Sequence, residues 1–272
     1  MTEPLHLGVS TAAFFPQPLA DTLDLLARLP WKSVELMPQT PDECTAEFAD
    51  TVLALGAGRL DFCAIHFPQI LAPFLYNPYP GALAYGQALC TGLADQAGRL
   101  GCNTIIVHGP WASMSEGAFY DATLNNLRLL CDSAQPHGVT IGLENSPSVP
   151  HTNTPAAQAA FAAAIDRPNL GFTVDTTHAY QMQQDPLDYV RALPTIAHVH
   201  ASDYQLARKQ QHVLPGQGDL DWATLLVELR QRGFQGNFIL ELLPETLGPD
   251  PEQGLRASMA FLQPLLAAAG WA

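Results

Sequence analysis

The chain has 272 residues and carries 12 Lys and Arg against 26 Asp and Glu, a formal net charge of −14 at pH 7. This acidity disfavours binding to a phosphate backbone or an anionic membrane, because like charges repel. The N-terminal MTEPLHLGVST lacks a basic region followed by a long apolar one, and the chain has no run of about 18 apolar residues. The five cysteines form no CxxC pair. We expect a cytoplasmic protein with reduced, buried thiols and with neither a membrane nor a nucleic acid as partner.

Eight apolar, strand-like runs alternate with eight stretches of helical periodicity, and no linker divides residues 1–272. This alternation predicts one α/β domain, a (β/α)8 TIM barrel, whose usual size of about 250 residues fits the chain. An open doubly wound sheet would need a G-x-G-x-x-G turn after an early strand, which GVSTAAF does not provide. In chain order the expected strands are 5–11, 33–38, 60–67, 104–109, 139–145, 170–176, 196–202 and 237–243. The expected helices are 19–29, 45–55, 83–100, 118–134, 155–164, 186–193, 222–232 and 253–268.

Local signals mark several boundaries. Pro155 suits the first turn of a helix, Asp221 suits an N-cap, and Gly233 suits the end of the same helix. Residues 67–81 are rich in Pro and aromatic residues, which predicts a loop without helix that either walls a pocket or packs on the barrel rim; its aromatic residues are Phe67, Phe74, Tyr76 and Tyr79. The polar connection 203–219 is expected to be a solvated loop.

Four metal-ligand residue types stand at the downstream ends of strand-like runs. Glu144, Asp175, His200 and Glu241 are separated by 31, 25 and 41 positions, which leaves room for roughly one βαβ step of about 30 residues each time. The C-terminal ends of barrel strands meet at one mouth, so these side chains are expected to converge there. Carboxylate and imidazole ligands suit a divalent ion such as Mn²⁺, Zn²⁺, Co²⁺ or Fe²⁺.

His66 and His108 extend the series upstream, again at strand ends. Each residue alone has a simpler interpretation, since a strand-end carboxylate often caps the next helix and a strand histidine often lies satisfied in a core. Their joint occurrence favours a cation, because several carboxylates buried together need neutralising charge.

The motifs that hold these residues resemble the xylose isomerase-like TIM-barrel superfamily, which contains sugar isomerases and epimerases, inosose dehydratases and endonuclease IV. The resemblance covers nearly the whole chain and is carried by GLEN (142–145), VDTTH (174–178), HVHASD (198–203), GQGDLDW (216–222) and ILEL (239–242). The opening GVSTAAF and SVEL (33–36) look more like the isomerase and epimerase branch than the nuclease.

In that branch the resemblance implies that Glu144, Asp175, His200 and Glu241 bind the metal. It also implies that Glu144 and Glu241 are the catalytic acid and base, and that His178 contacts the substrate. We expect the metal to bind a carbonyl and its neighbouring hydroxyl, and proton transfer by the glutamates to pass through an enediolate. His66, His108 and Arg208 are further candidate substrate contacts. A small sugar or polyol is the expected substrate, and a homodimer is the expected assembly.

The nuclease branch implies more metal ions. His66 and His108 match the ligands of a second ion shared with Glu144, and His178 and His212 match ligands of a third. An aspartate expected for the third ion falls on Gln210, and a neutral amide coordinates zinc poorly. An endonuclease IV-like zinc phosphodiesterase acting on abasic DNA is therefore the alternative function. A non-catalytic sensor of sugar or metal is a third.

Overall fold

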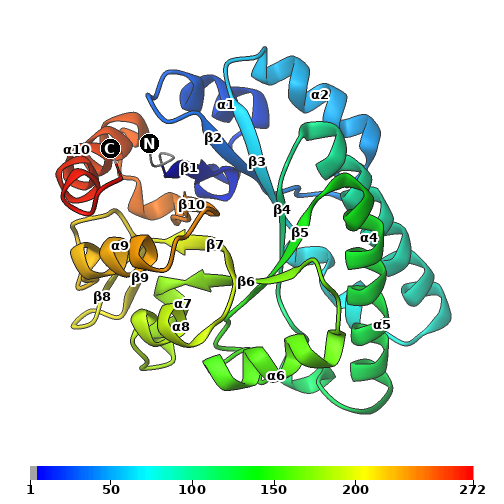
Figure 1. The fold of residues 1–272 in the computed structure, drawn as a ribbon. Helices are drawn as coiled ribbons and strands as arrows, with labels where there is room; N and C mark the ends of the chain where they lie inside the picture. Colours follow the sequence, from blue (N-terminus) through cyan, green and yellow to red (C-terminus); the bar gives the residue numbers. More distant parts are fainter. Residues whose placement is uncertain (1–4, 272) are drawn as a thin grey trace.

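The computed structural model describes residues 5–271, and the barrel predicted from the sequence is confirmed. Eight parallel strands close in the order β1-β10-β7-β6-β5-β4-β3-β2, and helices surround them (Figure 1). The strands are β1 His6–Ser10, β2 Ser33–Leu36, β3 Asp61–His66, β4 Thr104–Val107, β5 Thr140–Glu144, β6 Leu170–Asp175, β7 Ile196–Ala201 and β10 Asn237–Leu240.

The eight expected helices are present between these strands. They are α1 Leu19–Ala27, α2 Ala46–Gly56, α4 Pro80–Leu100, α5 Gly117–Ala134, α6 Pro155–Ile165, α8 Pro186–Ala192, α9 Trp222–Gln231 and α10 Pro251–Ala268. Pro155 begins α6, the Asp221 side chain accepts a hydrogen bond from Thr224 N–H as the N-cap of α9, and Gly233 follows α9 with a left-handed φ of 67°. None of the helices described between residues 5 and 271 is both long and apolar enough to span a bilayer.

Two connections contain more structure than the sequence indicated. Residues 67–81, expected to lack helix, form the 3-10 turn Gln69–Leu71 and the short helix α3 Pro73–Tyr76 before α4 begins. Burial stabilises this segment despite its prolines, because Tyr76 is fully buried and donates a hydrogen bond to the His108 carbonyl at 3.2 Å. Pro73 and Pro80 each stand at the start of a helix, where the missing N–H is not needed.

The connection 203–219 was expected to be a solvated loop, and this is wrong for its buried part. It forms a two-stranded antiparallel hairpin, β8 Asp203–Gln205 and β9 Gln210–Val213. The Asp203 carboxylate is buried and accepts hydrogen bonds from the Gly216 and Leu220 main-chain N–H groups and from the Trp222 indole. A short helix, α7 Thr176–Gln181, also follows β6 directly.

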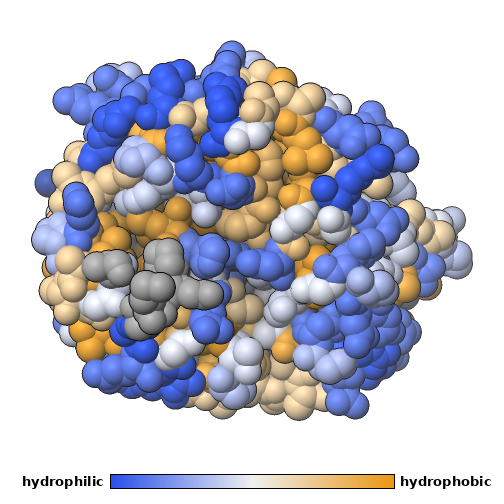
Figure 2. Space-filling model, turned by 45° about the horizontal axis from the view of Figure 1, so that its top comes forward, coloured by the Kyte–Doolittle hydropathy of each residue, from blue (hydrophilic) through white to orange (hydrophobic). Residues whose placement is uncertain are grey.

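The main apolar core lies between the strands and the helices, and a separate small cluster of Cys63, Ala64, Ile106 and Ile239 contributes to the barrel interior. All five cysteines are buried and unbridged, as expected. On the face drawn in Figure 2, hydrophilic residues cover much of the surface, with apolar areas between them.

Candidate metal centre

The four strand-end residues converge at the C-terminal mouth of the barrel. Glu144, Asp175, His200 and Glu241 each offer one ligand atom, and these four atoms lie within 4.8 Å of one another. The register explains the convergence, because Asp175 pairs with His200 across β6 and β7, and Glu241 follows β10 directly. Glu144, Asp175 and His200 are fully buried, whereas the Glu241 side chain keeps 12% of its surface exposed.

Glu144 is the centre of the cluster. Its Oε1 lies 3.1 Å from His200 Nδ1 and 3.2 Å from His178 Nδ1, and its Oε2 lies 2.8 Å from His108 Nε2 and 3.4 Å from His66 Nε2. His200 Nδ1 also lies 3.3 Å from Glu241 Oε2. The structure therefore brings the candidate histidines of β3, β4 and α7 to the same carboxylate.

Two further groups match the additional ions considered from the sequence. His66, His108 and Glu144 can offer ligand atoms within 4.8 Å of one another, and so can Asp175, His178 and His212. Both groups share a carboxylate with the four-residue set. The geometry therefore permits more than one ion, although Gln210 begins the exposed end of β9 and brings no carboxylate to the last group.

Charge interactions separate the two glutamates. Burial raises the pKa of Glu144, but His108 and His200 outweigh it and hold that pKa well below its ordinary value. Burial raises the pKa of Glu241 to about 8, and Glu144 and Asp175 add to the effect against the opposing His200. The environments of the two glutamates therefore shift their carboxyl pKa values in opposite directions.

The histidines respond to the same carboxylates. Burial lowers the pKa of His178, but Asp175 and Glu144 raise it to about 10. His200 likewise titrates well above its ordinary pKa, because Glu241, Glu35 and Glu144 overcome the effect of burial. Burial dominates at His108 and lowers its pKa. Protonation of His178 and His200 thus supplies positive charge beside the carboxylates of this pocket.

Unpaired oxygens within the pocket fit a divalent cation. Glu144 Oε2, Asp175 Oδ2 and Glu241 Oε2 are buried atoms without a well-aligned hydrogen bond among the described residues. Helix capping accounts for only one of the two Asp175 carboxylate oxygens. Oδ1 accepts a 2.6 Å hydrogen bond from His178 N–H at the start of α7, whereas Oδ2 has no such role. Three carboxylates and one imidazole leave coordination positions for a substrate on a five- or six-coordinate ion.

Asn145 holds the neighbouring strand end in place. Its side-chain amide donates to the Asp175 carbonyl at 3.0 Å and accepts from the Asp175 N–H at 2.7 Å. The Asn145 carbonyl lies 2.9 Å from His178 Nδ1 and accepts a hydrogen bond when that nitrogen is protonated. This asparagine therefore fixes the positions of Asp175 and His178 relative to β5.

Sequence reasoning missed two buried members of the cluster, Glu35 and His198. Glu35 Oε2 lies 2.9 Å from His200 Nε2 and 3.0 Å from His198 Nε2, and all three residues are fully buried. The available signal was period-two spacing, since alternate residues of a strand share a face and His198 stands two before His200. Glu35 was obscured within the apolar run SVEL.

The predicted substrate contacts lie in different places. Arg208 is exposed in the turn between β8 and β9, and its side chain has no hydrogen bond or ion pair with the ligand set in the described part of the chain. In the segment 67–81, Phe67 and Tyr76 lie beside His108 around a cavity of about 10 Å³, whereas Tyr79 is 71% exposed. Phe67 and Tyr76 of the segment 67–81 therefore pack into the protein, and a role of this segment as the wall of a substrate pocket stays a prediction.

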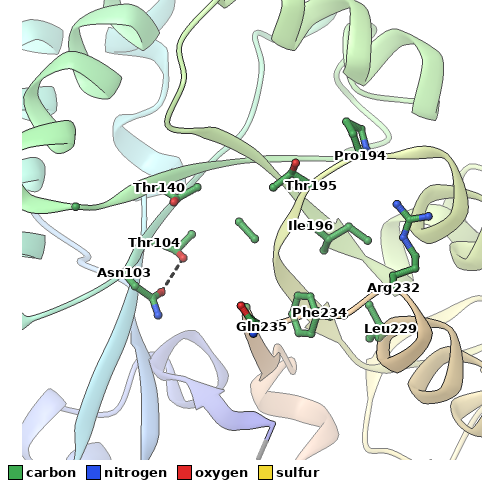
Figure 3. Close-up of a pocket in the computed structure, with 14 residues that line it drawn as sticks. Asn103, Thr104, Thr140, Pro194, Thr195, Ile196, Leu229, Arg232, Phe234 and Gln235 are labelled. Atoms are coloured by element: carbon green, nitrogen blue, oxygen red, sulfur yellow. Dashed lines mark hydrogen bonds between the residues drawn. The ribbon is translucent and has the colours of Figure 1, made fainter. Parts of the chain in front are cut away.

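A larger cavity of about 420 Å³ lies at the opposite, N-terminal mouth (Figure 3). Thr104, Thr140 and Ile196, which line it, are the first residues of their strands. Among the residues described by the structure, Arg232 is the one titratable residue that lines it, and its guanidinium donates to the Arg191 and Leu193 carbonyls. The described lining of this cavity therefore offers no general acid or base, in contrast to the C-terminal mouth, where barrel enzymes carry their active sites.

Comparison with known proteins agrees with this geometry. The family model described as a xylose isomerase-like TIM barrel matches residues 23–265. The chain belongs to this family. A protein of Methanocaldococcus jannaschii without an assigned function is 25% identical over 254 residues, which cover 91% of this chain and 92% of that protein. The xylose isomerase-like family assignment thus applies to nearly all of the barrel.

Two of the similar proteins have named activities. The 2-oxo-tetronate isomerase of Pectobacterium atrosepticum is 26% identical over 187 residues, covering 61% of this chain and 70% of that protein. The crystal structure of 3-keto-D-glucoside 4-epimerase from E. coli matches with a TM-score of 0.78 at 18% identity, over 96% of this chain and 99% of that chain. The second likeness concerns the fold alone.

Proposed function

We propose that this protein is a divalent-metal-dependent isomerase or epimerase of a sugar, a polyol or a keto-sugar. The observation that carries the proposal is the convergence of Glu144, Asp175, His200 and Glu241 at one barrel mouth, where one oxygen of each carboxylate lacks a well-aligned hydrogen bond among the described residues. Membership of the xylose isomerase-like family supports it. The 2-oxo-tetronate isomerase among the similar proteins supports the same reaction class.

The proposed chemistry is proton transfer at the carbon beside a carbonyl. A divalent ion held by the four residues would supply Lewis-acid polarisation of a carbonyl, which acidifies that neighbouring proton. Glu144 and Glu241 supply the groups that move the proton, one accepting it and the other returning it. His200 Nδ1 contacts both, at 3.1 Å from Glu144 Oε1 and 3.3 Å from Glu241 Oε2.

The two glutamates differ in access and in charge. Glu241 is the partly exposed member of the ligand set and is the carboxylate nearest to an incoming substrate. Burial raises the pKa of Glu241 to about 8, whereas nearby histidines hold the pKa of Glu144 well below its ordinary value. Environments that push two carboxyl pKa values apart are a common basis for dividing acid and base roles. We propose that His178, whose Nδ1 lies 3.2 Å from Glu144 Oε1, contacts substrate hydroxyls.

The charge of the chain bears on the substrate. With 12 Lys and Arg in 272 residues, few cations are available to hold a phosphate group. The nearest candidate from the sequence, Arg208, lies exposed at the hairpin turn. We therefore favour an unphosphorylated substrate.

Solvent exchange tests the proposal directly. Protein loaded in turn with Mn²⁺, Co²⁺, Zn²⁺ or Fe²⁺ is incubated in D₂O with a panel of ketoses and oxo-acids, and each substrate is followed by NMR. Deuterium is expected at the carbon beside the carbonyl for at least one substrate. Absence of exchange across the panel with every metal would count decisively against the proposed proton transfer.

Glutamine variants separate an enzyme from a sensor. Glu241→Gln removes one proton-transfer group, and loss of general acid–base catalysis lowers turnover by about 10² to 10⁴-fold. A non-catalytic sensor would keep its affinity for the sugar in Glu241→Gln. Neither the wild-type sensor nor the variant would exchange a substrate proton with solvent. Glu245→Gln is the matched control, because Glu245 is an exposed carboxylate four residues away.

A zinc phosphodiesterase acting on abasic DNA is the second candidate, favoured by the groups His66, His108, Glu144 and Asp175, His178, His212. The net charge of −14 opposes it, because phosphate contacts need Lys and Arg. Native mass spectrometry counts the bound ions, and a labelled duplex with one abasic site reports cleavage. Three tightly held zinc ions together with nicking of that duplex would establish the nuclease instead.

A further inference from the structure

Glu35 and His198 lie in an unusual place for charged or polar side chains. Glu35 pairs in register with Ala64, two residues before His66, and His198 pairs with Thr173, two residues before Asp175. Both therefore occupy the side-chain layer directly below the candidate metal centre. Branched apolar residues usually fill this part of a TIM barrel, and an unpaired carboxylate buried there is strongly unfavourable.

His200 connects this layer to the centre through its two ring nitrogens. Nε2 lies 2.9 Å from Glu35 Oε2, while Nδ1 lies 3.1 Å from Glu144 Oε1 and 3.3 Å from Glu241 Oε2. A neutral imidazole has one N–H and one lone pair. If the hydrogen stands on Nε2 and is donated to Glu35, the lone pair of Nδ1 is directed at Glu144 and Glu241.

We propose that Glu35, supported by His198, is a positioning residue that fixes the tautomer and ring orientation of His200 for metal binding. This inference rests on the proposed metal centre and adds the group that holds one of its ligands. Metal-bound histidines commonly donate their second ring N–H to a carboxylate, which raises ligand basicity and restricts the ring. Glu35 provides that carboxylate from a strand on which no metal ligand was assigned.

His198 limits the freedom of the Glu35 carboxylate. Its Nε2 lies 3.0 Å from the same oxygen, Oε2, that faces His200, although this contact is not a well-aligned hydrogen bond among the described residues. Oε1 of Glu35 is buried without a hydrogen-bond partner in the described residues, so the carboxylate is held on one side only. The His198 ring thus packs against the oxygen through which Glu35 holds His200.

A cation bound by Glu35, His198 and His200 themselves is the competing explanation, since their ligand atoms also lie within 4.8 Å of one another. That ion would need Nε2 of His200, the nitrogen assigned here to the Glu35 hydrogen bond. The two explanations therefore differ in the protonation of Nε2 and in the number of ions that depend on Glu35.

Nitrogen NMR of the zinc-loaded wild-type protein provides the first test and needs no variant. Positioning by Glu35 predicts that His200 has zinc on Nδ1 and hydrogen on Nε2. Zinc on Nε2 overturns the proposal. Zinc affinity, measured by competition with a chromogenic chelator, provides the second test. Loss of such an outer partner typically costs about 10 to 100-fold in metal affinity, which is the fall expected for Glu35→Gln at unchanged zinc stoichiometry.

Two variants control for a general effect on the barrel. Thr173→Val removes a buried hydroxyl without a hydrogen-bond partner from the same layer, and its zinc affinity should stay within about twofold of wild type. His198→Asn removes the second contact to Glu35 and should weaken zinc binding less than Glu35→Gln does. His198→Asn also serves as the test variant if Glu35→Gln does not fold, and wild-type affinity in His198→Asn would then refute the proposal.

The outcomes separate this inference from the proposed function. Wild-type zinc affinity in folded Glu35→Gln refutes positioning while leaving the metal centre in place. Loss of one zinc ion per chain in Glu35→Gln refutes the positioning role and supports a cation bound directly by Glu35. Failure of the wild-type protein to bind any of the four metals refutes the metal centre itself, and with it both proposals.

Discussion

Replacement of Asp203 tests how the chain builds one wall of the barrel mouth. The buried carboxylate accepts hydrogen bonds from Gly216 N–H at 2.7 Å, Leu220 N–H at 2.9 Å and Trp222 Nε1–H at 3.0 Å. It thereby ties the segment after β9, and the start of α9, to the end of β7. Asp203→Ala leaves three donors without their acceptor.

The size of the effect follows from these contacts. A hydrogen bond to a charged group contributes about 1.5–3 kcal/mol, and a buried donor left unpaired costs about 1–3 kcal/mol. Gly216 lies in a surface segment where water can replace the carboxylate, so we expect a value near the low end of these ranges. Loss of the three hydrogen bonds in Asp203→Ala should lower the free energy of unfolding by about 4 kcal/mol. Asp203→Asn keeps an acceptor on one side only and should cost about 2 kcal/mol.

Calorimetry of the metal-free proteins provides the measurement. A loss of 1 kcal/mol lowers the melting temperature by about 2–4 °C for a domain of this size, so Asp203→Ala should melt about 10 °C below wild type. Tryptophan fluorescence should change as well, because the Trp222 indole N–H loses the carboxylate that accepts its hydrogen bond. A fall of less than about 2 °C for Asp203→Ala would show that the carboxylate does not hold this wall.

Three further predictions concern the metal, a helix cap and the barrel. Burial raises the pKa of Glu241 to about 8, so metal binding must displace its proton below that pH. Displacement of this one proton should raise metal affinity by up to about tenfold per pH unit between about pH 6 and 7.5. Calorimetry in buffers of different ionisation enthalpy should detect the released proton, and a pH-independent affinity would contradict the assignment. Asp221→Ala should lower the free energy of unfolding, measured by urea denaturation, by about 1 kcal/mol through loss of the N-cap of α9. Asp221→Asn should leave that free energy almost unchanged, because asparagine also caps helices. Gly8→Ala should be poorly folded by circular dichroism, because an added Cβ would lie 2.3 Å from the Ser33 carbonyl oxygen; a wild-type melting curve would exclude that clash.

Hydrophobic periodicity in the sequence was sufficient for the fold. Eight apolar runs and eight helical stretches were placed close to their observed bounds, since each element buries a face with its own repeat. The start of α6 at Pro155 and the N-cap of α9 at Asp221 were also readable, because both signals are local. Proline suits the first helical turn, where its missing N–H is not needed, and Asp221 accepts a hydrogen bond from Thr224 N–H within one turn. The segment 67–81 was wrongly expected to lack helix, since burial of Tyr76 outweighs a composition rich in Pro.

The convergence of the four candidate ligands was predictable for a related reason. Glu144, Asp175, His200 and Glu241 were identified by their positions at strand ends, and barrel geometry brings all strand ends to one mouth. Their exact roles as metal ligands and acid–base groups stay proposals that the experiments above decide.

Long-range pairing decided what the sequence could not. The sequence alone determined the repeat of elements, the barrel and the residues that face its mouth, because these depend on periodicity and on chain order. Only the tertiary structure placed Glu35 against His200, 165 residues away, and turned a polar connection into the hairpin held by buried Asp203. Such contacts depend on the register between strands and on which side chain fills each interior layer, and neither is written in local sequence.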